Sequence, residues 1–145
     1  MFEAVGERFW PSYFAQLGRC LKPGGRAAVQ TITIADERFG AYRRGTDFIQ
    51  RHIFPGGMLP SPTEFERRAA GADFRVRDRL AFGGDYARTL AQWQLNFEAA
   101  WPEIAAQGFD SRFRRLWCFY LAYCEAGFRS GATDVYHYLL EQRRS

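Results

Sequence analysis

Hydrophobic residues near the start of the chain recur at steps of three and four and then give way to a continuous run. The first set predicts a helix over residues 8–21 with an aromatic face made of Trp10, Tyr13, Phe14, Leu17 and Leu21. The turn Pro23-Gly24-Gly25 ends this helix, and the small and β-branched residues after it predict a strand over residues 26–35 with both faces covered. Helix, turn and strand in this order form half of a βαβ crossover, so we expect the partner strand before residue 1.

Gln30 is the one large polar side chain on this apolar strand. A buried amide needs hydrogen-bond partners or a ligand. The strand is therefore the spine of an α/β sheet, the wall of a site, or both. Gln30 either satisfies neighbouring backbone groups or belongs to that site.

Residues 35–60 have no regular hydrophobic period. Ala35 to Arg44 is charged and indicates a loop, whereas residues 45–60 combine aromatics, glycines and prolines and indicate a short helix followed by an apolar loop. This insert is either a cap over the core or the wall of a tunnel for an apolar substrate.

Capping and alternation define the next two elements. Ser61 and Glu64, with Pro62 at the first helical position, predict a helix over residues 62–70. Residues 74–82 alternate apolar and charged side chains, which predicts a half-buried strand. The arginines on its other face suit a sheet edge, where charge discourages pairing with other chains.

Aromatic residues at helical spacing fill the last part of the chain. They predict helices over residues 86–106, with a kink or restart at Pro102, and over residues 111–130. Such stripes are more typical of a core than of a cofactor site. A last strand over residues 133–142 returns the chain to the sheet, so the whole pattern predicts an α/β fold.

Composition agrees with one compact domain, because 47% of the 145 residues are hydrophobic and 17% are aromatic. The formal charge of +4 rests on nineteen arginines and Lys22 against sixteen acidic residues. Guanidinium groups bind phosphate well, so lipid headgroups and nucleotides are candidate ligands beside a merely solvated surface. The arginines are dispersed along the chain, which argues against a nucleic-acid binder.

The cysteines Cys20, Cys118 and Cys124 have no metal-ligand spacing. We therefore expect reduced thiols in a cytoplasmic protein and no metal site. No secretory segment opens the chain, and its longest apolar run, Leu116 to Cys124, is too short to span a bilayer. Any membrane contact is expected to be peripheral, at the inner face.

Five segments carry a family resemblance: Met1-Phe2-Glu3-Ala4-Val5-Gly6, Leu21-Lys22-Pro23-Gly24-Gly25, Phe48 to Gly57 with Leu59-Pro60-Ser61, Asp85-Tyr86 with Thr89-Leu90, and Leu121 to Phe128. The Ile53-Phe54-Pro55-Gly56-Gly57 segment and its neighbours are the most specific of them. Together they resemble the C-terminal portion of the cyclopropane-fatty-acyl-phospholipid synthase family of S-adenosylmethionine-dependent methyltransferases. The resemblance implies part of a Rossmann-like α/β fold, with a three-stranded partial sheet whose last strand is antiparallel and lies between the other two.

In that family the glycine-rich cofactor loop and the ribose-binding acid belong to earlier strands. The resemblance therefore implies that S-adenosylmethionine binds mostly upstream of this chain, and no residue here is assigned to it. We expect a fragment, a late-started reading frame or a chain completed by a second polypeptide, inactive alone. The open edge of the strand at residues 26–35 is expected to recruit a complementing chain or another copy.

The family holds a bicarbonate that acts as the base. By resemblance this implies four catalytic positions, together with an upstream cysteine: Glu3, Gln30 at a histidine position, the backbone of Ile32, and Tyr86. The substrate implied is the double bond of an unsaturated phospholipid acyl chain. The insert is expected to contact that chain through Phe48, Ile53, Phe54, Pro55, Gly56 and Gly57.

Two departures from the family pattern alter this expectation. Ala4 and Gln30 each stand where the family has a histidine. Glutamine donates hydrogen bonds to an oxyanion but takes up no proton, which puts bicarbonate binding in doubt. We therefore predict methyl- or methylene-branched products rather than cyclopropanes.

Other interpretations of these residues remain. The alternative for Glu3 is a surface carboxylate without a role in a site. The alternative for Tyr86 is a packing role at the start of its helix. For the whole chain, the alternative is a non-catalytic lipid-binding or interaction module that keeps the aromatic tunnel without a cofactor.

Overall fold

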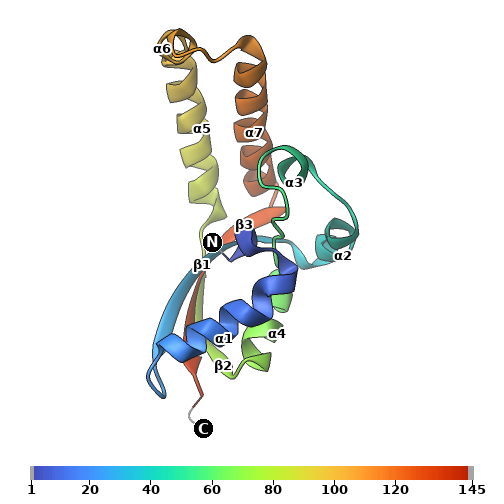
Figure 1. Ribbon diagram of the computed structural model, residues 1–145, viewed down its shortest axis with the longest axis vertical. Helices are drawn as coiled ribbons and strands as arrows, with labels where there is room; N and C mark the ends of the chain where they lie inside the picture. The colour runs from blue at the N-terminus through green and yellow to red at the C-terminus, as the bar shows by residue number, and fades with distance from the viewer. Residues whose placement is uncertain (1, 144–145) are drawn as a thin grey trace.

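The computed structural model describes residues 2–143, so Met1, the first residue of the segments that carry the family resemblance, lies outside the described part. Within these residues, two short 3-10 turns, seven α-helices and three strands follow one another in the order η1 (Glu3–Val5), η2 (Glu7–Phe9), α1 (Trp10–Cys20), β1 (Arg26–Ile34), α2 (Asp36–Arg44), α3 (Phe48–His52), α4 (Pro62–Gly71), β2 (Phe74–Ala81), α5 (Gly83–Ala99), α6 (Trp101–Ala106), α7 (Ser111–Arg129) and β3 (Thr133–Gln142). Figure 1 shows the sheet with α1 and α4 at one end and the α5–α7 helix pair extending away from it.

The described strands form one sheet in the order β1-β3-β2, and β3 is antiparallel to both neighbours. The register sets Gln30 of β1 and Leu80 of β2 opposite the same residue of β3, His137. The predicted α/β fold, with its last strand antiparallel between the other two, is confirmed.

One face of the sheet is covered by α1 and α4. Aromatic rings fill this layer: Phe2 stacks on Trp10 with ring centroids 5.1 Å apart, and Phe65 of α4 stacks on Tyr138 of β3 at 4.3 Å. These four side chains are almost completely buried. The aromatic spacing of residues 10–21 therefore does form a core face, with α1 as its helix.

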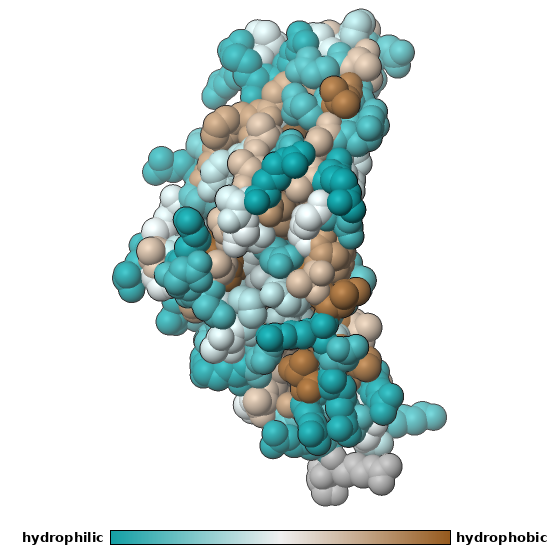
Figure 2. All heavy atoms as spheres, turned by 180° about the vertical axis from the view of Figure 1, so that it is seen from behind, coloured by the Kyte–Doolittle hydropathy of each residue, from teal (hydrophilic) through white to brown (hydrophobic). Residues whose placement is uncertain are grey.

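The other face of the sheet is covered only at one end. Ile32 of β1 and Val135 of β3 pack under α5 and α7, whereas Ala28, Gln30 and His137 are open to solvent. The prediction that β1 is covered on both faces is thus wrong for the described residues, because the helix pair points away from the sheet instead of lying across it. Figure 2, seen from behind, shows apolar surface between hydrophilic side chains on this side of the molecule.

A β-bulge changes the alternation of β2. The register with β3 shifts between Val76 and Asp78, so Arg79 faces the helix-covered side and bonds Glu66 of α4 at 2.7 Å. Leu80 is turned to the open face, where 61% of it is exposed. A bulge inserts one extra residue and moves later side chains to the other face. The predicted position of β2 at a sheet edge does match the strand order.

Residues 36–44 form helix α2, so the loop predicted for Ala35 to Arg44 is wrong. The charges that suggested a loop instead complement the helix dipole, with Asp36 in the first turn and Arg43 in the last. Thr63 of α4 donates to the Asp36 carboxylate through its hydroxyl at 2.9 Å. Residues 3–5 form a short 3-10 turn.

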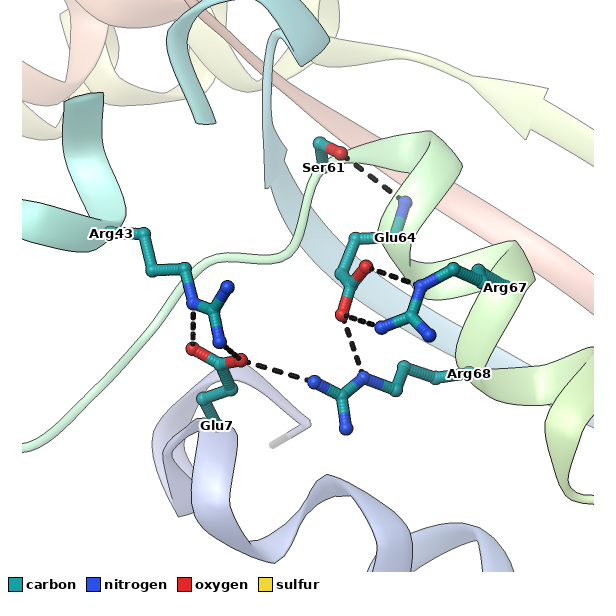
Figure 3. Close-up of polar contacts among 6 residues, drawn as sticks. All are labelled: Glu7, Arg43, Ser61, Glu64, Arg67 and Arg68. Atoms are coloured by element: carbon teal, nitrogen blue, oxygen red, sulfur yellow. Dashed lines mark hydrogen bonds and ion pairs between the residues drawn. The ribbon is translucent and has the colours of Figure 1, made fainter. Parts of the chain in front are cut away.

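A network of charged side chains fixes the N-terminal turn to α2 and α4 (Figure 3). Glu7 lies between Arg43 of α2 at 2.7 Å and Arg68 of α4 at 3.1 Å. Arg68 also bonds Glu64 at 2.7 Å, and Arg67 bonds the same carboxylate. The Arg67 and Arg68 guanidinium groups hold the pKa of Glu64 below its ordinary value. The network places residues 3–7 against the rest of the chain.

Candidate functional site

Gln30, Tyr86 and His137 form a hydrogen-bonded chain on the open face of the sheet. The Gln30 side chain donates from Nε2 to the Tyr86 hydroxyl at 2.6 Å, and its Oε1 lies 2.7 Å from Nε2 of His137. Three elements meet here, since Gln30 is on β1, His137 on β3 and Tyr86 in the first turn of α5.

The start of α5 is held tightly over β3, which positions Tyr86. The backbone N–H of Gly83 donates to the Asp134 carboxylate at 2.7 Å, and a β-carbon on Gly83 would stand 2.5 Å from that oxygen. Phe82, just before the helix, lies edge-on to His137 with centroids 4.5 Å apart and contacts the Tyr86 ring at 5.8 Å. Glycine at position 83 therefore lets the helix begin close enough for Tyr86 to reach Gln30.

Ile32 lies on the same face of β1 as Gln30, two residues further along the strand. Together with Tyr86 it packs against the buried cluster between α5 and α7. Three of the four predicted catalytic residues therefore share one side of the sheet.

Glu3 lies on the other side. Its carboxylate accepts a hydrogen bond from the Thr31 hydroxyl at 3.1 Å, and the buried Thr31 points to the face opposite Gln30. The Glu3 carbonyl also accepts from the backbone N–H of Met58 at 2.8 Å, which ties the N-terminal turn to the insert. The described residues thus do not gather Glu3 with Gln30 and Tyr86 in one cluster.

The glycine loop of the insert closes onto the N-terminal turn. Gln50 donates from its side chain to the Gly57 carbonyl at 3.0 Å, and a hollow of about 440 Å³ lies between residues 4–9 and the pair Pro55 and Gly56. Phe54, which precedes Pro55 in the loop, is 55% exposed, and Ile53 is half-buried. These loop residues were predicted to contact substrate.

Phe48, the other aromatic residue of the predicted substrate contacts, packs on α7 instead. Its ring lies edge-on to Phe119 at 4.6 Å and contacts Tyr123 at 5.9 Å. We call Phe48, Phe119 and Tyr123 the aromatic cluster. Burial, and then the Asp47 carboxylate, raises the pKa of Tyr123, whose hydroxyl donates to Asp47. Because 52% of Phe119 is exposed, the cluster offers an apolar surface to a ligand.

The sequence did not reveal two contacts of the predicted site residues, that of His137 with Gln30 and that of Thr31 with Glu3. His137 has no partner at ligand spacing in the sequence, which by itself favours a core or surface role. Its contact with Gln30 follows from the β1–β3 register, which joins residues 107 positions apart. The sequence gives a period for each strand but no register between them.

Within residues 2–143, no group of three or more His, Cys, Asp or Glu side chains is arranged to hold a metal ion. The cysteines are free thiols, and burial raises the pKa of Cys124 to about 11, so its sulfur is a poor nucleophile at neutral pH.

No described helix is both long enough and apolar enough to cross a membrane.

Comparison with known proteins assigns this arrangement to a family. The sequence model described as mycolic acid cyclopropane synthetase matches residues 1–138. The chain belongs to this family. Among curated relatives, the chain is 44% identical over 141 residues to tuberculostearic acid methyltransferase UfaA1 of Mycobacterium tuberculosis. It is 37% identical over 135 residues to the cyclopropane-fatty-acyl-phospholipid synthase of Escherichia coli.

Those matches cover 97% and 93% of this chain but only 33% of each relative. The chain therefore spans about a third of the length of the curated relatives it matches. A solved structure, mycolic acid cyclopropane synthase CmaA1 complexed with SAH and CTAB, superposes with a TM-score of 0.86 at 26% identity. That superposition covers 97% of this chain and 52% of CmaA1. The predicted family resemblance is confirmed.

Proposed function

We propose that this chain is the acyl-binding part of an S-adenosylmethionine-dependent methyltransferase that acts on the double bond of unsaturated phospholipid acyl chains. The observation that carries the proposal is membership of the cyclopropane synthetase family over residues 1–138. At the positions where the resemblance implies the binding site of the family's base, Gln30 Nε2 and the Tyr86 hydroxyl lie 2.6 Å apart. The related CmaA1 structure contains SAH.

S-adenosylmethionine, when bound, supplies an electrophilic methyl group. No residue of this chain is assigned to it, because the sequence contains no Gly-x-Gly-x-x-Gly motif of the kind that binds such a cofactor. The chain's own residues act on the acyl substrate. A methyl group added to a double bond leaves a cation, which aromatic faces stabilise and a base must deprotonate.

The aromatic cluster and the insert supply the apolar contacts in this proposal. Phe119 presents its exposed ring beside the half-buried Phe48, and Phe54 adds exposed apolar area beside Pro55 to Gly57. Burying such rings against an acyl chain contributes about 1.5–3 kcal/mol for each side chain. Tyr86 and Gln30 offer hydrogen-bond donors to an oxyanion of the bicarbonate class, with Ile32 contributing its backbone and Glu3 acting from the other side of β1.

We further propose a methyl- or methylene-branched product. Gln30 takes up no proton, so the proton leaves the acyl cation by a different route from that of a histidine-containing site. The relative at 44% identity is named a methyltransferase of tuberculostearic acid, and the one at 37% is named a cyclopropane synthase. These identities favour the branched product.

Substrates of this kind reside in a bilayer, so we propose peripheral contact with the cytoplasmic face of the inner membrane. The exposed residues Arg43, Arg44 and Arg51 flank the apolar loop of the insert, where they suit lipid phosphates. Arg43 is also bonded to Glu7, so Arg44 and Arg51 are the better candidates. Sedimentation with vesicles of anionic unsaturated phospholipid tests this contact. A chain that fails to bind the vesicles at low as well as at high salt would contradict it.

We propose that residues 1–145 are inactive alone and need the remaining two thirds of the relatives' length in the same chain or in a complementing one. The exposed edge of β1 is where that partner, or a second copy, would pair. Light scattering on the 145-residue polypeptide tests the open edge. Association or aggregation is expected, and a monomer with sharp thermal unfolding would contradict it.

A second candidate function is lipid binding without catalysis, which the exposed aromatic cluster favours. The two are separated by incubating the complete gene product with unsaturated phospholipid vesicles and methyl-labelled S-adenosylmethionine. Methyl transfer predicts label in the acyl chains and its loss in Tyr86→Phe, with the exposed Gln92→Ala as an unaffected control. Vesicle binding with no affinity for S-adenosylmethionine would instead support the lipid-binding module.

A further inference from the structure

His137 occupies the centre of the open sheet face, between Gln30 on one side and Leu80 on the other. A hollow of about 360 Å³ runs over this face, lined by residues that include Gln30, Leu80, His137 and Asp78. The imidazole is exposed yet held in place by the edge-on Phe82 ring at 4.5 Å. Neither the family resemblance nor the predicted site gives it a role.

The two hydrogen bonds of Gln30 define a direction. A side-chain amide has an oxygen that only accepts and a nitrogen that only donates. In this orientation of the amide, Oε1 of Gln30 faces Nε2 of His137, and the two form a hydrogen bond when that ring nitrogen carries a proton and donates it. The Gln30 nitrogen is then turned to the Tyr86 hydroxyl, whose oxygen accepts. The Tyr86 proton is left to donate to a further group.

Reversing the amide would reverse the outcome. If His137 carried its proton on Nδ1, its Nε2 would accept from the Gln30 nitrogen and the amide oxygen would face Tyr86. The Tyr86 proton would then be used internally, and its oxygen would meet a ligand as an acceptor. An acceptor repels an oxyanion, whereas an O–H donor binds it with a short, charge-assisted hydrogen bond.

We infer that His137 is a positioning residue that, through Gln30, aims the Tyr86 hydroxyl proton at an oxyanion of the carbonate class. The inference rests on the proposed function, in which Tyr86 and Gln30 offer hydrogen-bond donors to that oxyanion. His137 does not touch the oxyanion, because it acts by fixing the orientation of the Gln30 amide. An imidazole thus serves this site from β3, although the β1 position where the family resemblance implies a histidine is occupied by glutamine.

The first test measures which nitrogen of the His137 imidazole carries the proton. Nitrogen-15 NMR of the complete gene product, labelled at histidine, distinguishes a protonated Nε2 from a protonated Nδ1, and His137→Gln identifies the signal. A proton on Nε2 is expected at neutral pH. A neutral ring with its proton on Nδ1 would overturn the inference, whatever the enzyme's activity.

The second test uses two substitutions of similar size. His137→Gln keeps a donor toward Gln30, whereas His137→Met removes it. Binding of carbon-13 bicarbonate is expected to weaken about tenfold in His137→Met, the equivalent of one hydrogen bond, and to stay within about twofold of the wild type in His137→Gln. Thermal unfolding of both variants and of the control Gln92→Ala shows whether either has lost its fold.

The outcomes separate this inference from the proposed function. Bicarbonate binding that depends on the residue 137 donor, without methyl transfer to any acyl chain, would contradict the proposed function and support the role of His137. Equal bicarbonate affinity in the wild type and in folded His137→Met, or no bicarbonate binding by the wild type, would overturn the inference even if methyl transfer occurs.

Discussion

Gly6 and Gly56 meet so closely that a β-carbon on Gly6 would stand 2.6 Å from the Gly56 carbonyl oxygen. This contact joins the N-terminal turn, which carries Glu3, to the glycine loop of the insert. Gly6 also has a φ of +77°, a conformation in which other residues are strained. The position of Glu3 relative to the insert therefore depends on glycine at position 6.

We predict that Gly6→Ala lowers the free energy of unfolding by about 1–3 kcal/mol, because it adds both backbone strain and a steric clash. Chemical denaturation measures the change. Gly71→Ala is the matched control, since a β-carbon there meets nothing within 4 Å. It should be neutral or slightly stabilising, and an equal loss in the two variants would contradict the role given to Gly6.

The charged network at Glu7 gives a second prediction. Only 19% of the Glu7 side chain and 23% of the Arg68 side chain are exposed, so their interaction is less screened than a surface pair. Glu7→Gln should lower the free energy of unfolding by about 1–2 kcal/mol. Arg88→Gln breaks an exposed pair with Asp85 and should change it by less than about 0.5 kcal/mol. Urea denaturation in low and high salt compares the two.

Glu141 links all three strands and predicts how stability depends on pH. It bonds Arg77 of β2 at 2.6 Å and Arg26 of β1 at 3.1 Å. Hydrogen bonds from Arg77 and then Arg26 lower the pKa of Glu141 from 4.5 to about 2. A lowered pKa stabilises the fold above the unfolded-state value, and this contribution is lost as pH falls from about 4.5 toward 2.

Denaturation midpoints measured between pH 7 and pH 2 test this dependence. Glu141→Gln should begin less stable at neutral pH and lose less stability on acidification. Glu103→Gln on α6, which carries no such pair of arginines among the described contacts, should follow the wild type. Parallel curves for wild type and Glu141→Gln would show that the strand-linking carboxylate does not contribute.

Phe119 tests the aromatic cluster as an acyl-binding surface. Because 52% of this side chain is exposed, Phe119→Ser should change the free energy of unfolding by less than about 1 kcal/mol. In the complete gene product it should raise the KM for unsaturated phospholipid vesicles by about 3- to 10-fold, since apolar contact is lost. Leu95→Ser on α5, where Leu95 is 66% exposed, is the control expected to leave the KM unchanged. Equal effects would remove the cluster from the binding surface.

Local signals in the sequence predicted the elements that local interactions stabilise. Ser61 caps α4 as its spacing to Glu64 indicated, with its hydroxyl accepting from the Glu64 N–H at 3.3 Å. Helix α2 was missed because its support comes from distant residues: Thr63 bonds Asp36, and Phe39 packs against the core. A charged segment with few apolar residues gives no such signal by itself.

Contacts between residues that meet only through the pairing of strands could not be predicted from the sequence. The resemblance placed Gln30, Ile32 and Tyr86 at site positions, and the structure puts them on one side of β1. The resemblance gave no indication that Glu3 contacts Thr31 on the opposite side or that His137 faces Gln30. Both contacts depend on strand register and on which face the helices leave open.

The most direct measurement is mass spectrometry of acyl chains after the complete gene product acts on unsaturated phospholipid vesicles with carbon-13 methyl-labelled S-adenosylmethionine. Acyl chains heavier by one labelled carbon, with a methyl or methylene branch at the former double bond, are predicted. Acyl chains that gain no labelled carbon would contradict the assignment of this chain to lipid methylation, and a product made solely of cyclopropanes would contradict the role given to Gln30.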